Sequence, residues 1–182
     1  KTDFNDAQVL FQASSFGGTS KFAEKDLANA RLIEPVMESV GWGGFTSTEL
    51  EKKLTGKQVA LSSGLSYYSE SLSGSSTPKD LRTLFELIYL RFQRPMNDAD
   101  AYRTVINAIR TGLENADKNP QKAFGDSVRT TLYGNNPRKA QLTLADLKQA
   151  NYETIKQLYA QRFNKGGDFD FYFTGAVNVD SL

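Results

Sequence analysis

Three stretches of the chain alternate between hydrophobic and polar positions in the manner of β-strands: residues 7–14, 57–72 and 168–174. The middle stretch is interrupted near Ser63-Gly64, so it predicts two strands joined by a turn or bulge. Gly74-Ser75-Ser76, directly after it, predicts a flexible connector. In the last stretch three Phe residues fall at alternate positions, which places them all on one strand face, towards a core.

Between these stretches, apolar positions recur at helical spacing. The spacing predicts helices over residues 25–40, 46–54, 81–92, 97–118, 121–132 and 143–163. Pro35 lies inside the first helix and predicts a kink or a restart, because proline removes a backbone hydrogen bond. The helix over residues 81–92 is apolar on most sides, which is typical of a central, buried helix.

Several helix starts carry a capping residue followed three positions later by an acid. These pairs are Thr46 with Glu49, Thr77 with Asp80, Asn97 with Asp100 and Thr143 with Asp146. The order of strands and helices predicts an α+β fold, in which an antiparallel sheet is backed by helices on one face. We expect residues 1–182 to form one such domain. Because the chain begins at Lys1 without Met, we expect it to be a fragment of a larger, multi-domain protein.

The composition excludes several kinds of chemistry. The 182 residues contain no His and no Cys, which removes Ser-His-Asp and Cys-His catalysis, disulfides and every His- or Cys-based metal motif. Lys and Arg number 22 and Asp and Glu 21, and the signs are interspersed, so nucleic-acid binding has little electrostatic support. No stretch approaches the roughly 20 apolar residues of a membrane span. An independent carboxylate enzyme stays open, since a cleft with two acids of different pKa is not visible in sequence.

Three local groupings each permit a functional interpretation beside a plainer one. Residues 17–20, Gly-Gly-Thr-Ser, superficially suggest a phosphate cradle, but they lack the P-loop spacing and favour a simple turn. Residues 42–45, Trp-Gly-Gly-Phe, form a loop that is either packed or in contact with a substrate or partner. Asp168 and Asp170 flank Phe169 and favour a solvated strand face over a catalytic carboxylate pair.

Several phrases of the sequence, taken in order, resemble one repeat of the pitrilysin/insulinase (M16) family of zinc metallopeptidases. The phrases are residues 11–20, residues 72–76 leading into Asp80-Leu81, the apolar helix ending at Pro95, and residues 132–138, 142–147, 159–163 and 173–178. Their order and spacing cover nearly the whole chain. The resemblance implies a clamshell of homologous α+β units, one of which carries the zinc motif H-x-x-E-H on its first helix.

The corresponding helix of this chain does not carry that motif. The resemblance places Arg31 and Pro35 where the His ligands would stand and keeps the Glu as Glu34. An arginine stays protonated and a proline has no ligand atom, so this chain is expected to hold no metal, no cofactor and no catalytic residue. The family also supplies an Arg/Tyr pair to the substrate from a later unit. Arg129 and Tyr133 lie four residues apart but outside that phrase, which favours a surface Arg beside a partly buried Tyr.

The resemblance therefore implies a non-catalytic lobe of a zinc peptidase that forms part of the wall of a peptide-enclosing chamber. Zinc and peptide hydrolysis would belong to a sister domain, and no activity is expected of this chain alone. Its partners would be sister domains or subunits and a polypeptide substrate, with no nucleic acid and no membrane span. Bacterial members of this type are often envelope proteins, which implies a periplasmic location. The alternative is a stand-alone assembly or binding protein on the same fold.

Overall fold

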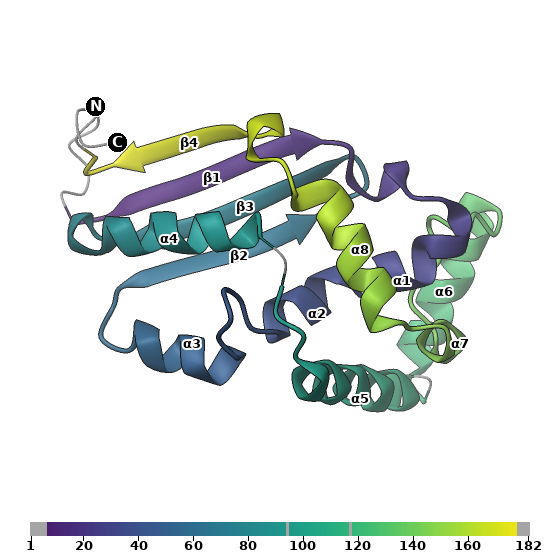
Figure 1. Cartoon of the computed structure of the whole chain (residues 1–182). Coiled ribbons are helices and arrows are strands. Elements are labelled where there is room, and N and C mark those ends of the chain that lie inside the picture. Colours follow the sequence, from purple (N-terminus) through teal and green to yellow (C-terminus); the bar gives the residue numbers. More distant parts are fainter. Residues whose placement is uncertain (1–6, 94, 117, 178–182) are drawn as a thin grey trace.

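In the computed structural model, which describes residues 7–93, 95–116 and 118–177, four strands form an antiparallel sheet in the order β2-β3-β1-β4 (Figure 1). The strands are β1 (Val9–Phe16), β2 (Val59–Leu65), β3 (Ser69–Ser76) and β4 (Asp170–Gly175). The first and last strands are neighbours, with Phe11 opposite Phe173. Asn178, the last residue of the phrase over residues 173–178, lies outside the described residues.

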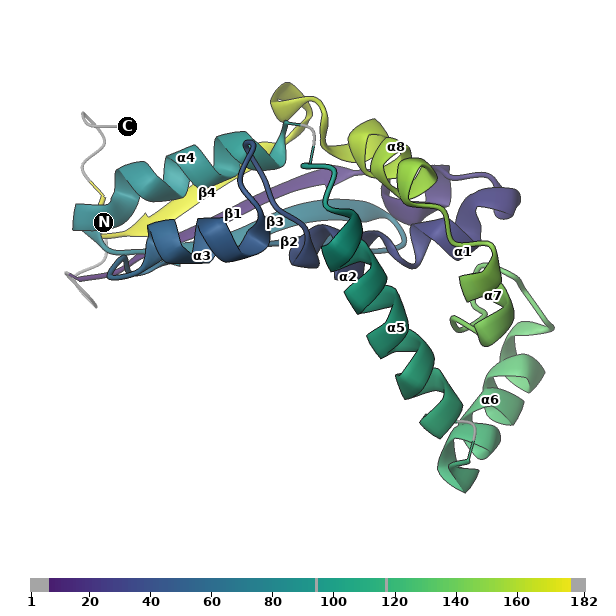
Figure 2. The same cartoon turned by 60° about the horizontal axis from the view of Figure 1, so that its bottom comes forward.

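The helices follow the order that the sequence predicts. They are α1 (Leu27–Ala30), α2 (Ile33–Ser39), α3 (Ser47–Leu54), α4 (Leu81–Arg91), α5 (Ala99–Ala116), α6 (Pro120–Tyr133), α7 (Leu144–Lys148) and α8 (Tyr152–Phe163). Short 3-10 turns cover Gly18–Lys21, Glu24–Asp26, Pro78–Asp80 and Gly166–Asp168. Helix α4 lies over the sheet, whereas α5 and α6 extend away from it as a V-shaped pair (Figure 2).

The sheet is covered by helices on one face. On the central strand β1, Val9, Phe11 and Ala13 are buried, whereas Leu10 and Phe16 on the opposite face are 50% and 88% exposed. This alternation arises because successive side chains of a strand point to opposite faces. The predicted α+β architecture, an antiparallel sheet with helices on one face, is therefore confirmed.

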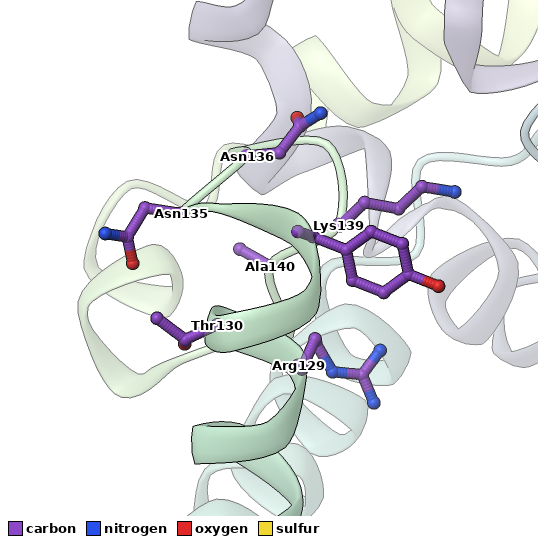
Figure 3. A pocket seen from close by; sticks show the side chains of 7 residues that line it. Arg129, Thr130, Asn135, Asn136, Lys139 and Ala140 are labelled. Carbon is purple, nitrogen blue, oxygen red and sulfur yellow. The ribbon is translucent and has the colours of Figure 1, made fainter.

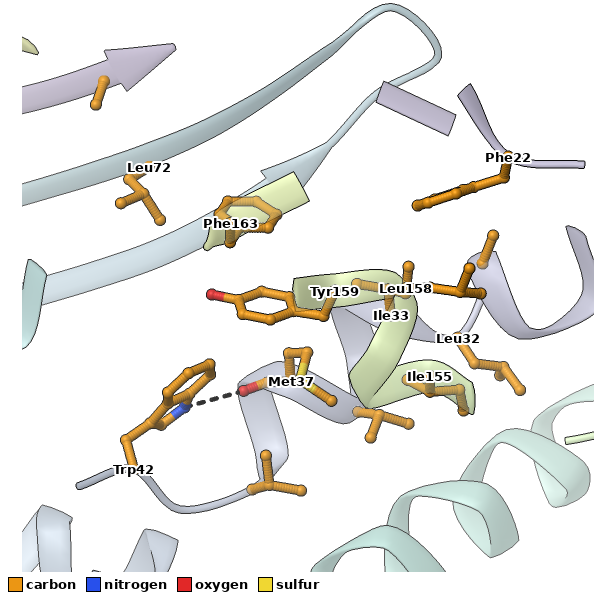
Figure 4. Close-up of a cluster of buried hydrophobic side chains, with 14 of the residues drawn as sticks. Phe22, Leu32, Ile33, Met37, Trp42, Leu72, Ile155, Leu158, Tyr159 and Phe163 are labelled. Carbon is orange, nitrogen blue, oxygen red and sulfur yellow. Dashed lines mark hydrogen bonds between the residues drawn. The ribbon is translucent and has the colours of Figure 1, made fainter. Parts of the chain in front are cut away.

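The centre of the core is aromatic and is supplied largely by α8 (Figure 4). The rings of Tyr159 and Phe163 stack with their centroids 4.5 Å apart, and Trp42 lies 5.4 Å from the Tyr159 ring. The Tyr159 hydroxyl donates to the carbonyl of Arg91 at 2.7 Å, which satisfies the polar end of a buried side chain. Burial raises the pKa of the Tyr159 hydroxyl well above its ordinary value.

The predicted division of the middle strands is wrong at two points. Ser63-Gly64 lies inside β2, and the turn falls at residues 66–68. The serine-rich stretch 69–76 is β3, a central strand that pairs with β1 and β2, and not a connector. At Gly74 an added Cβ would lie 2.6 Å from the Ala60 carbonyl oxygen and 3.2 Å from Leu84 of α4. Glycine at this position thus lets strand and helix approach, a long-range reason that local propensity does not show.

Two helix predictions also need correction, and a third is confirmed. Helix α4 is not buried all round, because Leu84 and Ile88 alone among its residues are buried and Tyr89 is 64% exposed. Helix α5 is capped by Asp98, whose carboxylate accepts the Ala101 N–H at 3.0 Å, and not by Asn97. The helix around Pro35 restarts as predicted, since α1 ends at Ala30 and α2 begins at Ile33.

Candidate functional site

Arg31, which the resemblance aligns with a His ligand of the metal motif, lies at the break between α1 and α2 and serves there as a structural cation. Its guanidinium Nη1 lies 3.6 Å from the Asp146 carboxylate of α7, and Nη2 donates to the carbonyl of Pro137. The side chain therefore ties the break to two later segments of the chain. Both contacts use the protonated guanidinium, which is a donor and not a metal ligand.

Glu34 points to the free edge of β2. Its Oε1 accepts the Leu65 N–H at 2.6 Å, and one turn later Glu38 accepts the Ser63 N–H at 2.9 Å and the Ser63 hydroxyl at 2.7 Å. Arg91 Nη2 donates to the Leu61 carbonyl at 3.4 Å on the same edge. Three backbone groups of this edge, the Leu65 and Ser63 N–H groups and the Leu61 carbonyl, are thus bound by side chains, which protects part of an edge that would otherwise be open to strand pairing.

Pro35, which the resemblance aligns with the other His ligand, has no ligand atom in its side chain. It is the third residue of α2, where its missing N–H leaves no intrahelical bond unmade, and its carbonyl accepts the Ser39 hydroxyl at 2.8 Å. The side chains of Arg31, Glu34 and Pro35 thus serve different segments and do not converge on one point. Within the described part of the chain, no group of three or more His, Cys, Asp or Glu residues is arranged to hold a metal. This donor set does not fit zinc, which binds through Cys, His and carboxylate ligands.

The glycine turn after β1 is a structural turn and not a phosphate cradle. The Gly17, Thr19 and Ser20 N–H groups donate to carbonyls of residues 66–68, at distances between 2.6 and 2.9 Å. The Gly18 N–H donates to the Glu70 carboxylate at 2.6 Å. Its amides are therefore already satisfied, one of them by an anion of the protein itself.

The tryptophan loop is packed, as the plainer interpretation has it. Trp42 is 3% exposed, and its indole N–H donates to the Met37 carbonyl at 3.3 Å (Figure 4). The Arg91 guanidinium lies over the ring, 4.7 Å from its centroid. Asp168 and Asp170 are both exposed, consistent with the solvated-strand interpretation.

Arg129 and Tyr133 do lie together, on the last turns of α6. They line a small surface pocket of about 120 Å³ together with Lys139 (Figure 3). Tyr133 is 50% exposed, so half of its surface is covered and half is open to solvent. The Lys139 ammonium lies 4.9 Å from the Tyr67 ring centroid and 5.6 Å from that of Tyr133. The pocket is a shallow cluster of exposed side chains.

The feature that sequence reasoning missed is an apolar groove between α3 and α4. Its volume is about 600 Å³, and its walls include Leu50 and Leu54 of α3 and Phe85 and Leu90 of α4. The signal was present in the pattern, because a helix that is apolar on most sides must cover more than a single sheet face. The sequence predicts that the apolar residues of α4 are buried on most sides. In the structure, some of these residues line the open groove.

This architecture is similar to that of the α+β units of pitrilysin-family (M16) peptidases, and comparisons with known proteins support the resemblance. No family model matches the chain. A zinc protease PQQL-like protein of Arabidopsis thaliana is 21% identical over 180 residues, which cover 98% of this chain and 16% of that protein. The chain thus spans less than a fifth of that relative's length.

Solved structures show the same fold. The periplasmic protease PqqL from Escherichia coli superposes with a TM-score of 0.82 at 22% identity, over 100% of this chain and 20% of that one. An inactive domain of a peptidase M16 from Pseudomonas fluorescens superposes with a TM-score of 0.76 at 15% identity, over 96% of this chain and 42% of that one. No helix in the described part of this chain is long and apolar enough to cross a membrane.

Proposed function

We propose that this chain is a non-catalytic lobe of a pitrilysin-type zinc peptidase, in which a sister domain binds zinc and hydrolyses peptide bonds. The observation that carries the proposal is the role of Glu34. In a fold shared with M16 peptidase units, the carboxylate of Glu34, which the resemblance aligns with the motif Glu, accepts the Leu65 N–H, and the sequence contains no His to complete a zinc site. Arg31, Glu34 and Pro35 would then be a degenerate form of the metal motif.

The lobe would form part of the wall of a peptide-enclosing chamber. The small share of the relatives that this chain covers supports a parent of several units, of which residues 1–182 are one domain. Its partners would be the sister units and a polypeptide substrate. A periplasmic location is supported by the description of PqqL as a periplasmic protease.

A complementation assay tests this function. The catalytic unit with H-x-x-E-H from the same reading frame is expressed alone, and its zinc-dependent cleavage of an unstructured peptide is followed with and without this chain. We expect this chain to be inactive alone and to raise cleavage by the catalytic unit. If it binds that unit without changing cleavage, or if the reading frame holds no such motif, the stand-alone assembly role replaces the proposal. Chelator-insensitive cleavage by this chain alone would overturn both.

A further inference from the structure

The groove between α3 and α4 is a wide opening with mostly apolar walls. Its volume of about 600 Å³ falls within the roughly 300–1,000 Å³ of ligand sites in proteins. No residue of α3 is buried, and Leu50 and Leu54, which line the groove, are only partly covered. The helix therefore presents apolar side chains to a space that no other described segment fills.

A second space of about 250 Å³ deepens the groove towards the sheet. It shares Leu50, Leu54 and Leu90 with the outer space and continues down to Trp42. Large side chains of a ligand could therefore be accommodated below the level of the helices.

One lysine on the groove wall, Lys53, has no direct ion-pair partner among the described residues, although the Glu49 carboxylate lies near enough to interact with it as a charge. Lys57 pairs with Asp80 at 3.4 Å, and Glu86 pairs with Arg82 at 3.0 Å, so these two lining charges are compensated. Lys53 makes no ion pair with any described residue, and its ammonium lies 4.5 Å from the Phe45 ring centroid. Glu49, one turn before it on α3, holds its carboxylate on the Thr46 N–H at 2.9 Å.

We propose that this groove binds an extended peptide segment, which places apolar side chains against Leu50, Leu54 and Phe85 and a carboxylate beside Lys53. Because the Glu49 carboxylate is bound to the Thr46 N–H, Lys53 has no direct partner, and covering its ammonium would cost desolvation that a ligand carboxylate offsets with a charge-assisted hydrogen bond. Thr83 and Glu86 on the groove wall offer hydrogen-bond acceptors to the N–H groups of a peptide. An acyl chain would displace water from these acceptors without offering a hydrogen bond in return. The inference rests on the proposed function, since it names the class of polypeptide that the lobe would retain.

The test uses the ¹⁵N-labelled 182-residue chain and two-dimensional NMR. The probe is the capped peptide acetyl-Leu-Phe-Leu-Asp-amide, with versions that carry Asn or Lys in place of Asp. We expect amide shifts at Leu50, Leu54 and Phe85, and an affinity about threefold lower for the Asn version and lower still for the Lys version. Titration with dodecanoate tests whether the groove binds a lipid chain. A dilution series of the protein tests whether it binds a second copy of this chain.

Two pairs of variants distinguish peptide binding in the groove from nonspecific binding. Lys53→Gln should remove the preference for Asp over Asn, whereas Lys52→Gln, on the exposed side of α3, should keep it. Leu54→Ser should weaken all three peptides, whereas Leu132→Ser, at a 71% exposed position of α6, should weaken none. If Leu54→Ser unfolds the chain, the comparison of Lys53→Gln with Lys52→Gln still tests the proposal.

Several outcomes would overturn the inference. They are shifts outside the groove, a preference for Asp that survives in Lys53→Gln, binding of dodecanoate but of no peptide, and groove shifts caused by dilution of the protein alone. If no peptide binds but the chain still raises cleavage by the catalytic unit, the groove inference fails and the proposed function stands. If the groove binds as expected but the chain does not associate with that unit, the proposed function fails instead.

Discussion

The guanidinium of Arg162, on α8, lies 2.5 Å from the carboxylate of Glu70, on β3. The other carboxylate oxygen of Glu70 accepts the Gly18 N–H at 2.6 Å, and Arg162 also donates to the Phe16 carbonyl at 3.2 Å. Glu70 is 1% exposed, so this ion pair is a buried junction between the last helix, the sheet and the turn after β1. Gly17 lies directly against the guanidinium, where a Cβ would collide with it.

Replacing Arg162 by Leu should lower the free energy of unfolding by about 3 kcal/mol, because Glu70 would be left as a buried charge without its partner. Urea unfolding followed by circular dichroism measures it. The matched control is Arg82→Leu, which breaks an exposed pair with Glu86 and should change the value by less than about 1 kcal/mol. Equal losses in the two variants would contradict the role of the buried junction.

Gly74→Ala should destabilise the chain by about 1–3 kcal/mol, since the new Cβ would be forced against the Ala60 carbonyl and α4. The same substitution at Gly112, inside α5, meets nothing within 4 Å and should stabilise the chain by up to about 1 kcal/mol through helix propensity. Thermal unfolding of both variants shows whether each substitution stabilises or destabilises the chain. A neutral Gly74→Ala would show that β3 and α4 do not approach as described.

Glu34→Ala should speed hydrogen exchange of the Leu65 amide and cost about 1 kcal/mol or less, since one exposed hydrogen bond at the β2 edge is lost. Exchange rates by NMR measure the effect at a single amide. Glu51→Ala, at an exposed position of α3, removes a carboxylate without touching the strand and serves as the control. Unchanged exchange at Leu65 in Glu34→Ala would rule out the carboxylate as the cap of this edge.

Asp80 should make stability depend on pH in the acid range. The Gln58 N–H, above all, and the nearby Lys57 hold the pKa of the Asp80 carboxyl below its usual value. A depressed pKa in the folded state contributes stability that is present above the unfolded pKa of about 3.9 and is lost as pH falls through the folded pKa. The stability difference between the parent chain and Asp80→Asn should therefore be largest near pH 7 and shrink below about pH 4. Urea unfolding at pH 7 and pH 3 measures it, and a difference that does not change with pH would refute it.

Zinc and chelators should leave the chain unaffected. Arg31 and Pro35 offer no ligand at the motif position, so neither zinc chloride nor EDTA should move the midpoint of thermal unfolding. Differential scanning calorimetry checks this, with calcium chloride as the control for nonspecific effects of a divalent ion. A zinc-specific rise in the midpoint would point to a carboxylate site that the described residues do not show.

The sequence by itself determined the features whose causes are local. The alternation of Val9, Phe11 and Ala13 predicts β1 because neighbouring side chains of a strand face opposite sides. The boxes Thr46 with Glu49 and Thr143 with Asp146 predict the starts of α3 and α7, since each closes over three residues. The absence of His excludes a His-ligated zinc site in any fold.

The tertiary structure decided what depends on groups far apart in the chain. Residues 69–76 become a central strand because β1 and β2 pair with them, although serine and glycine favour a connector locally. The carboxylate of Glu34 finds its partner 31 residues away and that of Glu70 finds Arg162 92 residues away. Such contacts depend on where the chain returns in space, which the spacing of residues along one helix or strand does not encode.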